Sequence, residues 1–264
     1  MRYVYFTKTL QKLDVPGLIA FCKDAGLAGL DMAVRPDFPV HPGNARTALP
    51  EAMKQLRDAG LTIGLVSTST NLADPASAEA VTIFEAAAKA GVPAVKPGYF
   101  RYAGKFDADL AQARNRLAGF AKLAEKTGVR CVYHTHSGTY IGNNCASLRM
   151  LLADADPHHV GAFIDTGHLA VNGGPIRQEL DMAKPWLAMV AIKDIVWEKG
   201  AKGWAHRVVP AGDGLVQWAD VSKGLKACNF DGTISLHGEY ETKDLAERVA
   251  LARREREFLT KTLS

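Results

Sequence analysis

The sequence lacks the features that mark disulfide-rich, membrane-spanning or nucleic-acid-binding proteins. Its four cysteines form no Cys-x-x-Cys pair and match no zinc-motif spacing. No window approaches the roughly 18 consecutive apolar residues that a membrane-spanning helix needs, and Met1 to Asp14 contain no apolar core of signal-peptide length. The net charge is +4, but the basic residues are scattered and form no nucleic-acid-binding block. We therefore expect a cytoplasmic protein that binds neither nucleic acid nor membrane.

The chain also lacks a Gly-x-Gly-x-x-Gly turn after its first β-rich run, which argues against a dinucleotide-binding fold. It has no low-complexity segment and no linker, so residues 1–264 are expected to form one domain. Short apolar runs alternate with longer amphipathic stretches throughout. Eight strands are predicted at Tyr3–Thr7, Gly29–Ala33, Thr62–Val66, Ala94–Lys96, Arg130–His134, Gly161–Asp165, Met189–Lys193 and Thr233–His237. Eight helices are predicted to start near Val15, Arg46, Pro75, Asp107, Asn144, Pro175, Gln217 and Lys243.

Eight β/α units favour an α/β fold of the (β/α)₈ barrel class. An open, doubly wound sheet also alternates strands and helices, but it gathers polar residues at one switch point. Here polar residues follow almost every predicted strand, as they do at the C-terminal face of a barrel, where the active site of that fold lies. The length of 264 residues is usual for one such barrel, which typically has about 250.

Three polar clusters at these strand ends are candidates for chemistry. His134-x-His136 has strand spacing, so both side chains point to the same side of the sheet. Asp165-x-x-His168 places a carboxylate and an imidazole within one turn after a strand. His237-x-Glu239 repeats the strand spacing. Imidazole and carboxylate together are typical ligands of divalent transition metals, which can polarise a carbonyl group.

Each of these features also has a purely structural interpretation. A single histidine at a strand end is commonly a hydrogen-bonded surface group, whereas convergence at several strand ends favours a site. Lys193 could be a solvated lysine, but it shares strand parity with Ala191 and so points at the barrel mouth. The stretch Trp197–Trp218 could serve for packing. As a long, glycine-containing seventh β/α loop, it is instead expected to form a lid.

Six segments together resemble the sugar phosphate isomerase/epimerase family, which has the xylose isomerase-like barrel fold. In order along the chain, they are Gly-Leu-Asp-Met-Ala-Val-Arg-Pro (29–36), Tyr-His-Thr-His-Ser-Gly-Thr (133–139), Ile-Asp-Thr-Gly-His-Leu (164–169), Ile-Lys-Asp (192–194), Pro-Ala-Gly-Asp-Gly (210–214) and Ser-Leu-His-Gly-Glu-Tyr (235–240). The family includes tagatose epimerases, hydroxypyruvate isomerase and inosose dehydratases. The resemblance implies a metal-assisted enzyme acting on a sugar.

The family's metal site has Glu, Asp, His and Glu from strands five to eight, and this sequence departs from it at three positions. Only Asp165 matches; the first Glu falls on His134, the His on Ala191 and the second Glu on His237. The resemblance therefore implies either a metal held by His134, Asp165 and His237, or loss of the metal with acid–base work by Lys193 and the histidines.

The main hypothesis is an isomerase or epimerase that abstracts a proton next to the carbonyl of a sugar, keto-sugar or cyclitol. A dehydratase on a keto-sugar or inosose, and a non-catalytic sugar-binding barrel with a decayed metal site, are the alternatives. A nuclease of the same fold is disfavoured because histidines expected on strands three and seven are missing.

The divalent metal would be Mn, Zn, Co or Mg, and association into a homo-oligomer is left open. The predicted roles are metal binding for His134, Asp165 and His237; catalysis for Lys193, Glu239, His136 and His168; and substrate binding for Arg35, Lys96, Tyr102 and Arg207.

Overall fold

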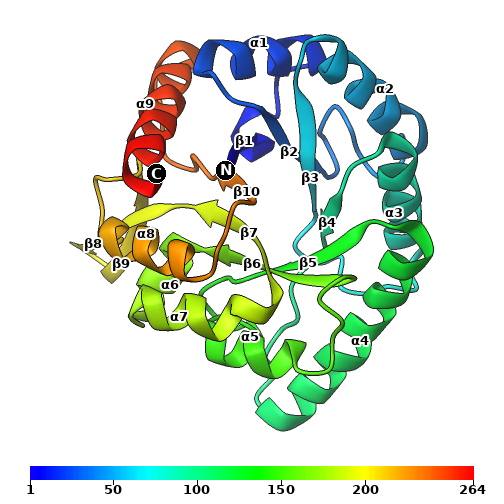
Figure 1. Cartoon of the computed structure of the whole chain (residues 1–264), viewed down its shortest axis with the longest axis vertical. Coiled ribbons are helices and arrows are strands. Elements are labelled where there is room, and N and C mark those ends of the chain that lie inside the picture. The colour runs from blue at the N-terminus through cyan, green and yellow to red at the C-terminus, as the bar shows by residue number, and fades with distance from the viewer.

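The computed structural model describes residues 1–264 and shows a closed barrel of eight parallel strands in the order β1-β10-β7-β6-β5-β4-β3-β2. The helices surround this ring of strands (Figure 1). The barrel strands are β1 (Arg2–Phe6), β2 (Gly29–Val34), β3 (Thr62–Thr68), β4 (Ala94–Lys96), β5 (Arg130–His134), β6 (Val160–Asp165), β7 (Leu187–Ile192) and β10 (Thr233–Leu236). The predicted fold class is confirmed.

The helices follow the predicted alternation, with one addition. They are α1 (Val15–Ala25), α2 (Ala45–Asp58), α3 (Ala78–Ala90), α4 (Phe106–Thr127), α5 (Cys145–Leu152), α6 (Thr166–Asn172), α7 (Ile176–Ala183), α8 (Trp218–Ala227) and α9 (Leu245–Leu263), with the 3₁₀ turns η1 (Thr7–Leu10) and η2 (Lys184–Trp186). The short helix α6 was not predicted. None of the helices is both long and apolar enough to span a membrane.

Local signals at the helix ends explain these boundaries. Asp14 caps α1 by accepting a hydrogen bond from the Gly17 backbone N–H. The predicted start of α3 near Pro75 is wrong by three residues, because the Ser77 hydroxyl, rather than Asp74, accepts from the first turn. Gly26 follows α1 in the left-handed conformation with φ of 69°, which costs glycine little and so ends the helix there.

A small apolar layer fills the inside of the barrel and supports the site. It consists of Leu65, Ala94, Val132, Phe163, Met189 and Ala191, which come from β3, β4, β5, β6 and β7. Alternate residues of a strand point to the same side, so the residue two positions further along also points inward. This places Ser67, Lys96, His134, Asp165 and Lys193 one step beyond the layer, at the C-terminal ends of the strands.

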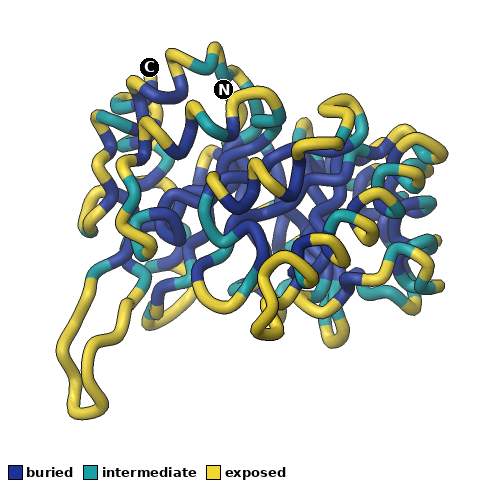
Figure 2. Tube along the Cα trace, turned by 90° about the horizontal axis from the view of Figure 1, so that it is seen from below, coloured by how far each residue is buried: buried dark blue, intermediate teal, exposed yellow.

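The segment after β7 is not the irregular loop that the sequence predicts. Strands β8 (Asp194–Gly200) and β9 (Gly203–Val209) pair as an antiparallel hairpin. Figure 2 shows this exposed hairpin projecting from the body of the molecule, on the side away from the termini. No residue of Trp197–Trp218 lines the cavity described below, so in this structure the hairpin does not act as a cover. Closure of the site by this segment stays a prediction.

Candidate active site and metal-binding cluster

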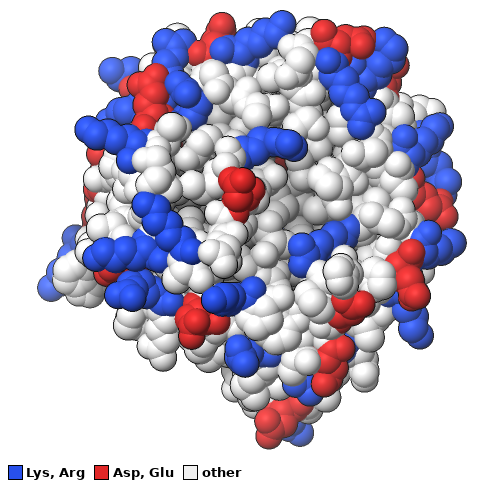
Figure 3. All heavy atoms as spheres, in the orientation of Figure 1, with Lys and Arg blue, Asp and Glu red and all other residues white.

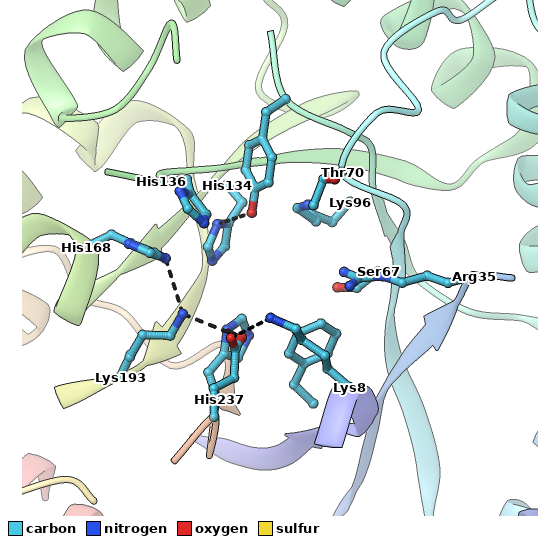
Figure 4. A pocket seen from close by; sticks show the side chains of 13 residues that line it. Lys8, Arg35, Ser67, Thr70, Lys96, His134, His136, His168, Lys193 and His237 are labelled. Carbon is cyan, nitrogen blue, oxygen red and sulfur yellow. Dashed lines mark hydrogen bonds and ion pairs between the residues drawn. The ribbon is translucent and has the colours of Figure 1, made fainter. Parts of the chain in front are cut away.

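A polar cavity opens at the C-terminal ends of the barrel strands, where the fold places its active sites. Eight of the eleven predicted site residues line it, and Asp165 lies fully buried against them. Figure 4 shows the lining side chains converging from different strands. The lining residues are Phe6, Lys8, Arg35, Ser67, Thr70, Lys96, Tyr99, His134, His136, His168, Lys193, His237 and Glu239.

Two predicted substrate-binding residues lie outside this cavity. Tyr102 is exposed, and its backbone N–H donates to the Thr139 carbonyl. Arg207 lies on β9, where its exposed guanidinium pairs with Glu198 of the neighbouring strand. The structure therefore does not bring these two side chains to the other predicted site residues.

His134, Asp165 and His237 form a compact group that could hold a metal ion, with one ligand atom from each lying within 4.8 Å of the others. Asp165 Oδ2 lies 3.4 Å from His134 Nε2 and 3.7 Å from His237 Nδ1. These distances exceed the 2.7–3.2 Å of a good hydrogen bond. They suit tetrahedral coordination, because metal–ligand bonds of 2.0–2.2 Å place ligand atoms about 3.4 Å apart.

The same three side chains carry buried polar atoms that have no hydrogen-bond partner: His134 Nε2, Asp165 Oδ2 and His237 Nε2. Buried polar groups are seldom left unpaired, because each costs free energy. A cation between the three side chains would satisfy His134 Nε2 and Asp165 Oδ2. On His237 it would meet Nδ1, the nitrogen that faces Asp165, because Nε2 faces Asp31. The residues present therefore fit a divalent metal.

Neighbouring groups fix the orientation of both imidazoles. The Tyr99 hydroxyl lies 3.0 Å from His134 Nδ1, which leaves Nε2 directed at Asp165. Behind His237, Asp31 Oδ2 lies 3.5 Å from Nε2, and it accepts a hydrogen bond from Ser235 Oγ at 2.8 Å. Carboxylates and hydroxyls behind metal-binding histidines commonly set the ring orientation and tautomer.

Asp165 is held by the helix that follows it. Its Oδ1 accepts a hydrogen bond from the His168 backbone N–H at 2.9 Å and so caps α6. The second oxygen, Oδ2, is left to face the histidines. The unpredicted helix α6 thus explains how Asp165 and His168 reach the same cavity.

Lys193 connects this group to the rest of the cavity. Its Nζ lies 3.2 Å from His168 Nε2, 3.5 Å from Glu239 Oε1 and 3.7 Å from Asp165 Oδ2. A dashed line marks the contact between Lys193 and His168 in Figure 4. His168 Nδ1 lies 2.9 Å from the Ser137 hydroxyl, and the centre of its ring lies 3.8 Å from that of the His136 ring, with the two planes tilted by 32°. An amine, two imidazoles and a carboxylate are therefore within reach of one small molecule.

Burial and charge set the protonation states in the cavity. Burial lowers the pKa of His134 to about 3, so its imidazole is neutral, as metal binding requires. Burial also lowers the pKa of His136, and that of His168 lies well below its ordinary value. Burial alone would raise the pKa of Glu239, but Lys193, His237 and Lys8 bring it down to about 2. Glu239 is consequently an ionised group and a weak base, better suited to orienting Lys193.

We expect the metal-free protein to lose stability as the pH falls below 6.5. His134 has a pKa of about 3 when folded and 6.5 as a free side chain, so the unfolded state takes up its proton first. Its contribution is complete above pH 6.5 and is lost on acidification toward pH 3, by about 1.4 kcal/mol per pH unit. Urea unfolding after chelation should therefore give a lower free energy at pH 5 than at pH 7. The His134→Gln variant should show a weaker dependence of the free energy of unfolding on pH. The same free energy of unfolding for wild type at pH 5 and pH 7 would contradict the lowered pKa of His134.

Five lining residues were not predicted to act in the site: the apolar Phe6 and the polar Lys8, Ser67, Thr70 and Tyr99. Ser67 could have been predicted from strand parity, because it lies two residues after Leu65 and so points to the inside of the barrel at the end of β3. Lys8 lies in η1, and its Nζ pairs with Glu239 Oε2 at 2.7 Å across the barrel mouth. A contact between residues 231 positions apart in sequence leaves no local pattern to detect.

The surface outside the cavity shows no extended block of one charge on the face in Figure 3, where basic and acidic side chains are interspersed. This agrees with the scattered charges of the sequence and offers no support for a nucleic-acid-binding face in that view.

Comparison with known proteins gives one family match over most of the chain: the model described as xylose isomerase-like TIM barrel matches residues 19–262. An inosose dehydratase of Lactiplantibacillus plantarum is 32% identical over 137 residues, 47% of this chain and 45% of that protein. An inosose dehydratase of Bacillus anthracis is 28% identical over 156 residues, 54% and 51% of the two chains. Each match therefore spans about half the length of the relative.

Solved structures share the fold at low sequence identity. The 3-keto-D-glucoside 4-epimerase of E. coli has a TM-score of 0.77 at 15% identity, covering 99% of both chains. The IolI protein with a bound zinc atom has a TM-score of 0.79 at 15% identity, covering 100% of both. D-psicose 3-epimerase of Clostridium cellulolyticum has a TM-score of 0.79 at 14% identity, again over 100% of both. At these identities the likeness shows the fold alone.

Proposed function

This chain belongs to the xylose isomerase-like TIM barrel family, and we propose that it is an enzyme that removes a proton next to the carbonyl of a keto-sugar or keto-cyclitol. The observation that carries the proposal is the placement of Lys193 Nζ within 3.2–3.7 Å of His168, Glu239 and Asp165. Asp165 belongs also to the candidate metal cluster, so an acid–base group and a metal site share one cavity.

The chain's residues divide into two groups in the proposed reaction. His134, Asp165 and His237 would hold the divalent metal, which supplies a positive charge that stabilises a developing enolate. Lys193 moves the proton to and from the substrate, while Glu239 holds the lysine in place. His136 and His168 contact substrate hydroxyl groups or carry the proton onward.

Elimination of water is the outcome that we favour over epimerisation. Epimerisation needs a base on each side of the carbon atom. The two glutamates that the family resemblance expects on strands five and eight are replaced here by His134 and His237, and both face Asp165. The partial relatives named inosose dehydratase also support elimination. Epimerisation or isomerisation is the second candidate, because sugar epimerases share the fold.

The experiment is incubation of the protein with a panel of keto-sugars and inososes in D₂O, followed by NMR. Deuterium entering next to the carbonyl reports proton abstraction that is reversed before any group leaves. Loss of water with formation of an enone identifies elimination, and a changed stereocentre identifies epimerisation. Saturable sugar binding without exchange, loss of water or a changed stereocentre would instead support a non-catalytic sugar-binding barrel.

We expect Asp165→Ala to abolish metal binding. The variant removes the one oxygen that faces both histidines and leaves two imidazoles, too few ligands for a tight divalent site. The measurement is elemental analysis of purified, untagged protein after exposure to Mn, Zn, Co or Mg followed by dialysis. Wild type should retain about one equivalent, and an exposed-histidine control, His158→Ala, should match it. A negligible metal content in both wild type and the Asp165→Ala variant would contradict the proposed metal site.

A further inference from the structure

Lys96 has a buried amine with no hydrogen-bond or ion-pair partner. Its side chain is 3% exposed, and its Nζ forms neither a hydrogen bond nor a salt bridge. The Nζ lies 3.8 Å from the centre of the Tyr99 ring, and it lines the cavity at the end of β4. A buried amine without a counter-charge is costly, and such groups are normally paired. Something outside the protein is expected to complete this position.

Arg35 offers a second unpaired cation on the same side of the cavity. Its Nε donates to the Thr68 carbonyl at 3.0 Å, which fixes the direction of the guanidinium. Its two terminal nitrogens form no hydrogen bond with the protein, and no carboxylate lies within salt-bridge distance. Figure 4 shows Arg35 and Lys96, with Ser67 and Thr70, on the side opposite Lys193 and His168.

None of the carboxylates of the site lies within salt-bridge distance of Arg35 or Lys96. Glu239 pairs with Lys8 and Lys193, and Asp165 faces the two histidines and Lys193. Asp31 Oδ2 accepts a hydrogen bond from Ser235, and Asp31 Oδ1 is buried without a hydrogen-bond partner. The cavity lining thus contains four basic side chains, from Lys8, Arg35, Lys96 and Lys193, and one carboxylate, from Glu239. The two basic side chains that have no paired carboxylate are Arg35 and Lys96, at the ends of β2 and β4.

We propose that Arg35 and Lys96 bind an anionic group of the substrate, a carboxylate or a phosphate, while the carbonyl end lies at Lys193. The inference rests on the proposed function for the position of the carbonyl, and it narrows the substrate to a keto-sugar acid or a keto-sugar phosphate. A guanidinium and an ammonium together form the charge-assisted hydrogen bonds that such oxygens accept. Burial and Arg35 hold the pKa of Lys96 well below its ordinary value, and a bound anion would counter both effects.

The test uses matched pairs of ligands that differ in one group. 5-Keto-D-gluconate and L-sorbose differ only by a carboxylate in place of a hydroxymethyl group; D-fructose 6-phosphate and D-fructose differ only by the phosphate. Calorimetric titration of the full chain should show tighter binding of at least one anion than of its neutral partner. Lys96→Met and Arg35→Gln should each reduce that preference by about 30-fold or more, since they remove one charged partner of a buried pair. Lys202→Met, on the exposed hairpin, should leave it unchanged.

Each outcome decides the question. A preference confined to the acid pair identifies a carboxylate, and one confined to the phosphate pair identifies a phosphate. Equal binding of charged and neutral partners, a preference that survives both substitutions, or no anion binding at millimolar concentration would overturn the inference. Circular dichroism of the variants excludes misfolding as the cause. Deuterium exchange of neutral sugars as fast as that of the anions would contradict this inference and support the proposed function. Anions that bind through Lys96 but show no reaction would support anion binding and contradict the proposed function.

Discussion

Asp194→Ala is expected to lower the free energy of unfolding by about 4 kcal/mol or more, the largest stability effect of any single substitution considered. The Asp194 carboxylate is fully buried. Five donors bond to it at 2.9–3.1 Å: the backbone N–H groups of Ile195, Gly212, Gly214 and Val216, and the Trp218 indole N–H. Removing the carboxylate leaves these donors buried without an acceptor. Urea unfolding followed by circular dichroism measures the loss.

Asp194→Asn should fall between wild type and the alanine variant, because the amide keeps one acceptor oxygen. Asp58→Ala removes an exposed carboxylate paired with Lys54, and it should unfold close to wild type. Limited proteolysis gives a second readout, because the Asp194 contacts tie the base of the hairpin to the barrel. A loss below about 1 kcal/mol, with unchanged cleavage between β9 and α8, would show that the loop is held by other contacts.

The role of Asp194 illustrates what the sequence could not reveal. Both the Ile-Lys-Asp (192–194) and the Pro-Ala-Gly-Asp-Gly (210–214) segments resemble the family, but nothing in either sequence indicates that the second segment surrounds the carboxylate of the first. Gly214 approaches so closely that a side-chain carbon there would lie 2.2 Å from Asp194 Oδ1. Contacts across 18–24 residues depend on the closed barrel, not on the pattern of either segment.

The barrel itself could be predicted because its strands are largely buried on both faces and several helices carry their own end signals. A nearly continuous apolar run is the expected form of such a strand, and eight runs define the barrel. The boundaries of β4 and β5 are as predicted. The hairpin of β8 and β9 was missed, since its residues are largely exposed and carry no burial pattern.

The centre of the site was predictable for a geometric reason. His134, Asp165 and Lys193 each lie two residues beyond a member of the inner apolar layer, so strand parity alone directs them into the mouth. Loop residues have no such rule. Tyr102 was chosen from the loop after β4, yet Tyr99 of the same loop bonds to His134. Whether the grouped residues act as assigned is a prediction that the variants must test.

The second large effect is expected at Lys193: Lys193→Met should lower the rate of deuterium exchange by about 10²–10⁴-fold, the usual contribution of a general acid–base group. The methionine side chain keeps the apolar stem but removes the amine that contacts His168, Glu239 and Asp165. Because Lys193 is proposed to act on the proton and not to bind the anion, kcat should fall far more than KM rises. NMR exchange rates in D₂O, measured over a range of substrate concentrations, separate the two constants.

The competing interpretation is that Lys193 only balances the charges of Asp165 and Glu239. In that case Lys193→Arg would restore activity, because a guanidinium keeps the positive charge but cannot give up its proton. If Lys193 transfers the proton, the arginine variant should stay as slow as the methionine variant while it still binds metal. Lys199→Met, on the exposed strand β8, should exchange at the wild-type rate. Full activity in the arginine variant would therefore leave charge balance as the role of Lys193, and the proton would have to move through His168.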